Sequence, residues 1–294
     1  MTGTAQSYFE NKINLRKLMY KKHVGSRLIR FVLYGAAAVC MIILVFMIGY
    51  IVYMGIPNLK WSLFEKNYNS ENVSLLPALV NTAQLMLMTL SISVPIGIFS
   101  AVYLVEYAKK DSLFVRFIKL TSETLQGIPS IVFGLFGYIF FVTVCGLKYS
   151  MISGTLTMSI MILPLIIRTA HEALYSVSDS FREGSYALGA GKVRTVFKII
   201  LPQALSGIMS GIILSIGRIA GESAALIYTA GSGTRMGLRP TDSARTLAVH
   251  LYCLYNEGLY LNEAFATAFV LLLTVIVINS LSGLISRKLN GQNL

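Results

Sequence analysis

The sequence consists largely of long apolar stretches separated by short polar segments. Uncharged stretches that meet or approach the length of a membrane-spanning helix, about 20 residues, occur six times. They predict helices at roughly residues 31–55, 77–106, 122–145, 151–173, 203–230 and 263–286. The first stretch is too long for the apolar core of a signal peptide, so we expect it to be retained. The pattern predicts an all-α, polytopic membrane protein with six transmembrane helices.

The composition supports a membrane protein. Of the 294 residues, 55% are hydrophobic and only 13% are charged, whereas a soluble domain carries about 25% charged residues. The three cysteines, Cys40, Cys145 and Cys253, are widely spaced. They therefore indicate neither a disulfide framework nor a metal site.

The distribution of basic residues predicts the orientation of the chain. If the N-terminus lies in the cytoplasm, 18 of the 25 Lys and Arg residues fall in cytoplasmic segments and six in outer segments, with Arg218 inside a helix. This bias follows the positive-inside rule and places both termini in the cytoplasm. The net charge of +12 is then a topology signal, and we expect no nucleic-acid partner.

Proline and glycine interrupt several of the predicted helices. The interruptions are at Pro95, Gly127-Ile-Pro129, Gly134, Gly137 and Pro164. Lipid cannot replace lost backbone hydrogen bonds, so such breaks face other helices or a cavity. They are consistent with ordinary packing kinks and equally with a core that lines a transport pathway.

The helix predicted at 203–230 carries two charges on a face of small residues. Steps of three and four residues place one set on a single side: Gly207, Gly211, Ser215, Arg218, Glu222 and Ala225. Small residues allow a second helix to approach closely. Charges inside a membrane are costly, so Arg218 and Glu222 either neutralise one another or serve an anionic substrate. In the second interpretation Arg218 contacts the anion, because its planar fork of donors matches phosphate or sulfate, and Glu222 holds the arginine in place.

The segment 174–203 predicts a helix, a glycine corner and a second helix. The corner is Gly189-Ala-Gly191, where glycine tolerates unusual backbone angles. An apolar face then follows at helical spacing, formed by Val193, Val196, Phe197 and Ile200, with Arg194 and Lys198 opposite and Pro202 at the start of the next helix. Spacing alone is consistent with an amphipathic helix on anionic lipid or with a surface for a partner protein.

This segment resembles the E-A-A-x3-G-x9-I-x-L-P loop of ABC-importer permeases. Five residues match at full spacing: Glu183, Gly189, Ile199, Leu201 and Pro202. The small residues Gly184 and Ser185 replace the two alanines of that loop. In the family this loop docks onto the ATPase subunit. The resemblance therefore implies a coupling role for Glu183, for Gly189, Ala190 and Gly191 at the corner, and for Ile199, Leu201 and Pro202.

Other segments are similar to the phosphate-specific (Pst) permeases, and most to their A-type subunit. The matching stretches are Y-L-V-E-Y-A at 103–108, I-P-S-I-V-F-G at 128–134, Leu163-Pro164 followed by Arg168-Thr169 and Glu172-Ala-Leu174, and G-R-I-A-G-E-S at 217–223. The resemblance runs from about residue 72 to the C-terminus. It implies a type I (MetI-like) importer core over 72–286, with a substrate pathway formed by Arg218, Glu222 and Arg168. The remaining parts are then a basic cytoplasmic tail (1–30), a first transmembrane helix (31–55) and a short cytoplasmic tail (287–294).

The resemblance also implies an activity and a set of partners. The chain would be a permease in the bacterial cytoplasmic membrane, within an ATP-driven importer of inorganic phosphate. Its partners would be a sister permease in a heterodimer, two copies of an ABC ATPase, and an extracytoplasmic phosphate-binding protein. MgATP would be bound by the ATPase, with no cofactor or metal on this chain. Sulfate, molybdate or a phosphonate remain alternative substrates, and the outer segment 231–260 is either the landing surface for the binding protein or a lid without a partner.

Enzyme motifs are incomplete in this sequence. Gly189-Ala-Gly-Lys192 resembles a phosphate-binding loop, but Tyr186 and Val193 stand where that motif requires Gly and Ser or Thr. His171-Glu172 begins a zinc-protease motif, but Tyr175 replaces its second histidine. We therefore expect a transport subunit rather than an enzyme.

Overall fold

The computed structural model describes residues 3–109 and 112–291, and the described chain is helical without strands. It divides into two compact units, Met1–Tyr53 and Met54–Leu294. Five of the described helices are long and apolar enough to cross a membrane, and a bent pair raises the number to six. This agrees with the predicted all-α membrane architecture.

The first unit consists of a single long helix. Helix α1 (Gly3–Gly55) ends where the sequence predicts but begins far earlier than residue 31. The tail predicted at 1–30 is thus helical from Gly3, because it contains no proline and is rich in Lys, Leu, Met and other good helix formers. From Ile29 onward the helix is apolar on all sides, which is typical of a helix that lies in lipid.

The second unit is built on four further long helices and several short elements. The long ones are α2 (Leu76–Val102), continued by the π-helical turn η3 (Tyr103–Tyr107), α5 (Met151–Tyr175), α8 (Leu201–Gly221) and α11 (Leu261–Gly291). The short ones include η1 (Ile56–Asn58), η2 (Trp61–Phe64), α6 (Asp179–Ala187) and α10 (Leu247–Glu257). The predictions at 77–106, 151–173 and 263–286 are confirmed to within a few residues.

The third predicted span is not a single helix. Helix α3 (Leu113–Gln126) is followed by α4 (Ser130–Gly137), which continues as the π-helical turn η4 (Tyr138–Val144), and the two parts meet at 101°. The break falls at residues 127–129, where Pro129 has no backbone N–H to donate and its ring prevents Ile128 from remaining helical. The prediction of one helix over 122–145 is therefore wrong.

The fifth span also differs from the prediction. A continuous helical run begins at α7 (Lys192–Thr195), passes through the π-helical turn η5 (Val196–Ile200) and ends with α8 at Gly221, so it occupies 192–221 rather than 203–230. Pro202 lies inside this run and does not begin it. The run continues past the proline because the π turn changes the backbone hydrogen-bond pattern from i−4 to i−5. Leu201 N–H accordingly donates to the carbonyl of Val196.

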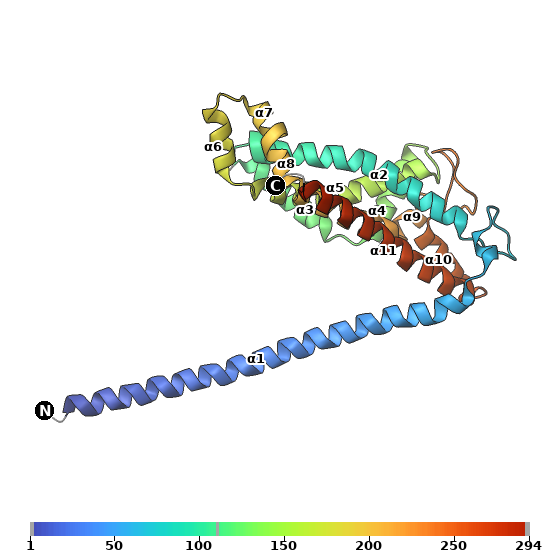
Figure 1. The fold of residues 1–294 in the computed structure, drawn as a ribbon. Coiled ribbons are helices and arrows are strands. Elements are labelled where there is room, and N and C mark those ends of the chain that lie inside the picture. Colours follow the sequence, from blue (N-terminus) through green and yellow to red (C-terminus); the bar gives the residue numbers. More distant parts are fainter. Residues whose placement is uncertain (1–2, 110–111, 292–294) are drawn as a thin grey trace. The chain divides into compact units, whose positions relative to one another are not determined.

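Helix α5 lies at the centre of the second unit, between α2 and α8 (Figure 1). Its buried side chains include Met158, Met161, Ile162 and Ile166. Glycines allow both neighbours to approach it closely. A Cβ at Gly207 of α8 would lie 2.6 Å from Cβ of Ala173, and a Cβ at Gly211 would lie 2.6 Å from Cβ of Thr169. The small-residue face predicted on α8 is thus a packing face against α5.

The two ends of the second unit carry different loops (Figure 1). Helices α6 and α7 lie at one end, and the segment 56–75 lies at the other. At that second end Asn81 of α2 donates to the carbonyls of Arg235 (3.1 Å) and Arg245 (3.2 Å) and accepts from Gly237 N–H (2.9 Å). These bonds fix the segment 229–246 to α2, so it is a packed part of the unit.

Candidate functional site

The segment that resembles a coupling loop folds as a helix, a corner and a helix. Ser178 caps α6 by accepting from Ser180 N–H (3.4 Å). Gly189 ends the first helix with φ +80°, a conformation that glycine adopts without strain. Across the loop the hydroxyls of Ser185 and Thr195, both buried, lie 2.8 Å apart. The corner is therefore a defined structure.

The residues predicted to couple this loop occupy two positions. Glu183, Gly189 and Gly191 are exposed, and Ala190 is half-buried. Ile199, Leu201 and Pro202 are half-buried at the base of the loop. There Ile199 and Leu201 pack against a core cluster shared by α2, α5 and α8. The arrangement joins an exposed corner to the helix core.

The apolar face predicted after the corner is divided in the structure. Val196 and Ile200 are buried, but Val193 and Phe197 are exposed. The prediction of one continuous face is wrong because the π turn η5 changes the helical period at this point. The exposed apolar residues continue onto the corner, where Leu188 is 90% exposed. Exposed apolar groups of this kind mark a surface that contacts a membrane or another protein.

Arg218 and Glu222 do not form the predicted pair. Helix α8 ends at Gly221, and Glu222 is in an extended conformation. Its Oε1 accepts from the N–H of Ala225 at 3.0 Å and so caps the short helix α9 (Ala224–Ile227). Within the described chain no carboxylate oxygen lies within 4.0 Å of the Arg218 guanidinium. The predicted contact between Glu222 and Arg218 is therefore wrong, whether as a neutralising or as a holding contact, and the contact of Arg218 with an anion stays a prediction.

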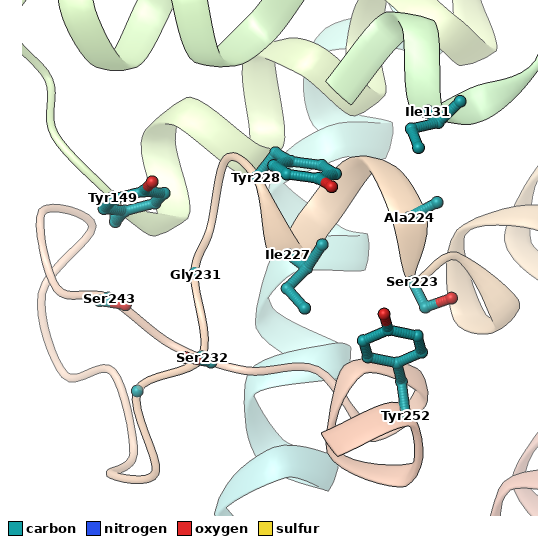
Figure 2. Close-up of a pocket in the computed structure, with 11 residues that line it drawn as sticks. Ile131, Tyr149, Ser223, Ala224, Ile227, Tyr228, Gly231, Ser232, Ser243 and Tyr252 are labelled. Atoms are coloured by element: carbon teal, nitrogen blue, oxygen red, sulfur yellow. The ribbon is translucent and has the colours of Figure 1, made fainter. Parts of the chain in front are cut away.

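A cavity of about 700 Å³ is lined in part by Ser223, Ala224 and Ile227, at the start of α9 and within it (Figure 2). Many of its lining groups carry hydroxyls: Tyr149, Ser223, Tyr228, Ser232, Ser243 and Tyr252. Burial raises the pKa of Tyr149, and the neighbouring Tyr138 adds to the rise, so its hydroxyl is neutral at physiological pH. Such a wall offers hydrogen bonds without fixed charge. The sequence did not indicate this cavity, because hydroxyl residues from three separated segments form it.

Arg168 is placed apart from that cavity. Its Nε donates to Oε1 of Glu172 at 2.9 Å, one turn further along α5. The pair borders a smaller cavity of about 200 Å³, together with Lys119, Glu123 and His171. The structure therefore does not bring Arg168 to the hydroxyl-lined wall.

Comparison with known proteins agrees with this architecture. Residues 93–291 match the family described as the binding-protein-dependent transport system inner membrane component. The chain is 32% identical over 261 residues to a probable ABC transporter permease protein, YqgI, of Bacillus subtilis, covering 83% of this chain and 88% of that protein. It is 33% identical over 244 residues to the phosphate transport system permease protein PstA of Yersinia pestis, covering 80% of each.

A solved structure supports the fold. The inward-facing methionine ABC transporter MetNI matches with a TM-score of 0.56 at 19% identity, over 73% of this chain and 94% of the matched chain. At this identity the match concerns the fold of the chain. The chain is therefore a multi-pass permease subunit that belongs to the family of binding-protein-dependent transport system inner membrane components.

Proposed function

We propose that this chain is the permease subunit of an ATP-driven importer of inorganic phosphate. Its similarity to PstA of Yersinia pestis supports this substrate. The observation that carries the choice is Arg218, which lies in a membrane span and makes no hydrogen bond or ion pair within the described chain. A guanidinium in a membrane requires a partner, and its planar fork of donors matches a tetrahedral oxyanion.

The pathway that we propose has a charged part and a neutral part. Phosphate would contact the hydroxyl-lined wall around Ser223 and Tyr252 and the guanidinium of Arg218 on α8. Glu222 contributes by capping α9, which forms part of that wall, rather than by contacting Arg218. Arg168 lies in a second cavity, where its ion pair with Glu172 would need to open before it could meet the substrate.

The coupling loop and the partners complete the proposal. The corner formed by Gly189, Ala190 and Gly191 would dock onto an ABC ATPase, which binds MgATP, and the exposed Glu183 would contact it. Two such ATPases, a sister permease and an extracytoplasmic phosphate-binding protein would complete the complex. Both termini would lie in the cytoplasm, with the permease domain at 72–286. Closure of the ATPases would then drive alternating access around the pathway.

Uptake by the purified complex in proteoliposomes tests the pathway. We expect ATP-dependent uptake of radiolabelled phosphate, and a loss of about a hundredfold with Arg218→Ala, because a charge-assisted contact to the anion is removed. Lys66→Ala removes the same charge from an exposed loop and should leave uptake unchanged. Normal uptake by an assembled Arg218→Ala complex would contradict the assignment.

The same vesicles test the substrate and the loop separately. A complex that hydrolyses ATP but imports sulfate, molybdate or a phosphonate instead of phosphate would retain the permease role and overturn the substrate. A chain with which no ATPase co-purifies would overturn the role of the corner.

A further inference from the structure

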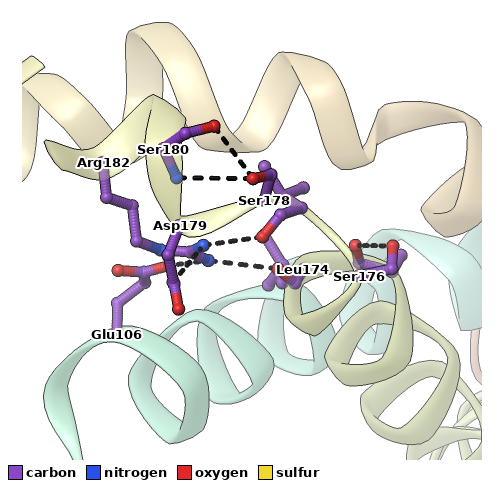
Figure 3. Close-up of polar contacts among 9 residues, drawn as sticks. Glu106, Leu174, Ser176, Ser178, Asp179, Ser180 and Arg182 are labelled. Atoms are coloured by element: carbon purple, nitrogen blue, oxygen red, sulfur yellow. Dashed lines mark hydrogen bonds and ion pairs between the residues drawn. The ribbon is translucent and has the colours of Figure 1, made fainter. Parts of the chain in front are cut away.

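One buried ion pair joins the loop to the end of α2 (Figure 3). Glu106 lies in the π turn η3, and Arg182 lies on α6. Arg182 donates through Nε (3.0 Å) and Nη2 (2.7 Å) to the same oxygen, Oε1 of Glu106. The two side chains are only 14% and 4% exposed, for Arg182 and Glu106 respectively.

The same guanidinium also holds the end of α5. Nη2 donates to the carbonyl of Leu174 (3.2 Å), and Nη1 donates to the carbonyl of Val177 (2.8 Å) and to Oδ1 of Asp179 (3.0 Å). The last carbonyls of a helix have no partner within the helix, and a cation is favourable there. One side chain of α6 therefore fixes the ends of both α2 and α5.

A second contact joins the other side of the loop to the same turn. The ammonium of Lys192 on α7 lies 4.7 Å from the ring centroid of Tyr107, which follows Glu106 in η3. The hydroxyls of Ser185 and Thr195 connect α6 to the run that begins with α7. The π turn η3 is thus contacted from both helices that flank the glycine corner.

We propose that the Glu106–Arg182 pair is a positioning contact that transmits movement of the loop to α2 and α5. Burial of two charges is a poor device for stability alone, since apolar side chains of similar size stabilise a fold as well. The contacts of Arg182 also fix the direction of its side chain. Its Nε, Nη1 and Nη2 atoms all donate hydrogen bonds, and the acceptors lie on η3, at the end of α5 and on α6. An ATPase that moves the corner would move both helix ends with it. This inference rests on the proposed role of the loop in coupling.

The number of phosphate ions imported per ATP hydrolysed tests the inference. In proteoliposomes with the complete complex and the binding protein, Glu106→Gln should lower this ratio about tenfold, because the lost charge releases Arg182 from η3. The conservative variant Glu106→Asp should retain part of the ratio. Asp179→Asn is the matched control, since it weakens a contact that Arg182 makes within α6, to a carboxylate that is 67% exposed. We expect its ratio to equal that of the unaltered chain.

The outcomes separate a coupling role from a structural one. Uptake and hydrolysis that fall in equal proportion, or that do not fall at all, would overturn the inference. If the Glu106→Gln complex does not assemble, the number of ions imported per ATP is measured with Glu106→Asp instead. An unchanged ratio in that variant would overturn the inference. If the unaltered complex imports another oxyanion, the proposed substrate fails, but the ratio for that oxyanion still tests the ion pair.

Discussion

At the scale of single residues, the glycines of α8 determine how closely the central helices pack. A side chain at Gly211 would meet Thr169, with Cβ atoms 2.6 Å apart, and α5 could move away only by disturbing α2 on its other side. The sequence indicated these small residues but not the helix they face. Membrane helices gain from such close approach, because van der Waals contact replaces the hydrophobic effect between them.

The first prediction concerns Gly211→Val. The larger side chain should separate α8 from α5 and lower the free energy of unfolding by about 1–3 kcal/mol, the usual cost of overpacking. The measurement is the thermal unfolding midpoint of the purified complex in detergent. Gly283→Ala in α11 is the control, since a Cβ there meets no atom within 4 Å. Equal midpoints for the two variants would contradict the packing argument.

A buried histidine lies beside an arginine at the other end of the unit. Arg245 Nη1 lies 3.3 Å from Nδ1 of His250, and an arginine only donates, so Nδ1 accepts and Nε2 carries the proton. Nε2 is buried without a hydrogen bond of normal geometry in the described chain. Burial, together with the charge of Arg245, lowers the pKa of His250 from 6.5 to about 4, although the backbone of Val73 offsets part of the shift.

The second prediction follows from that pKa. The unfolded chain binds the proton more readily than the folded one, so stability is complete above about pH 6.5 and is lost as the pH falls toward 4. The loss should reach about 2–3 kcal/mol. Unfolding midpoints measured from pH 7.5 to 4.5 should fall less steeply for His250→Gln, which keeps an acceptor for Arg245 but cannot take a proton in this range. Unfolding midpoints that fall equally with pH in the unaltered chain and in His250→Gln would contradict the low pKa of His250.

At the scale of elements, length and apolarity predicted most helices, because both are local properties of the chain. The bend at 127–129 was signalled by Gly127 and Pro129, but its angle depends on how α4 packs against α9 and α5. The sequence pattern predicted the end of α8 near residue 230, because Gly221 and Glu222 fit the helical spacing. In the structure the helix ends at Gly221, and Glu222 instead accepts a hydrogen bond from the start of α9. The contact of Glu106 with Arg182 spans 76 positions and follows only from the packed fold.

The third prediction concerns the glycine corner. Gly189 has φ +80°, and a Cβ there meets no atom within 4 Å, so Gly189→Ala strains only the backbone, by about 1 kcal/mol. We expect the corner to open and ATPase binding to weaken several-fold, as measured by the ATPase recovered with the tagged permease. Gly184→Ala is the control, because Gly184 lies in α6 with free space around it and alanine favours a helix. Equal recovery of the ATPase with Gly189→Ala and Gly184→Ala would contradict a role of the Gly189 conformation in ATPase binding.

At the scale of the whole molecule, the distribution of basic residues and the positions of the loops predict the same orientation of the second unit in a membrane. The corner of the loop lies at the end where α2 and α5 finish, and the segment 229–246 is bound to the beginning of α2. Within the sequence of this unit, 11 Lys and Arg residues fall in the segments predicted to be cytoplasmic and six in the segments predicted to lie outside. A membrane between these ends would therefore separate the loop from the outer segment.

The fourth prediction tests this arrangement in the membrane. In a chain without its three native cysteines, Leu188→Cys at the corner should react with a membrane-impermeant maleimide only from the cytoplasmic side, and Leu238→Cys only from the outside. Both leucines are highly exposed, at 90% and 85%, so reactivity reports sidedness rather than burial. Co-expression of the ATPase should protect position 188, because the corner then docks, and leave position 238 reactive. Labelling of both positions from one side would contradict the arrangement, whereas correct sidedness without protection would separate the topology from the docking role of the loop.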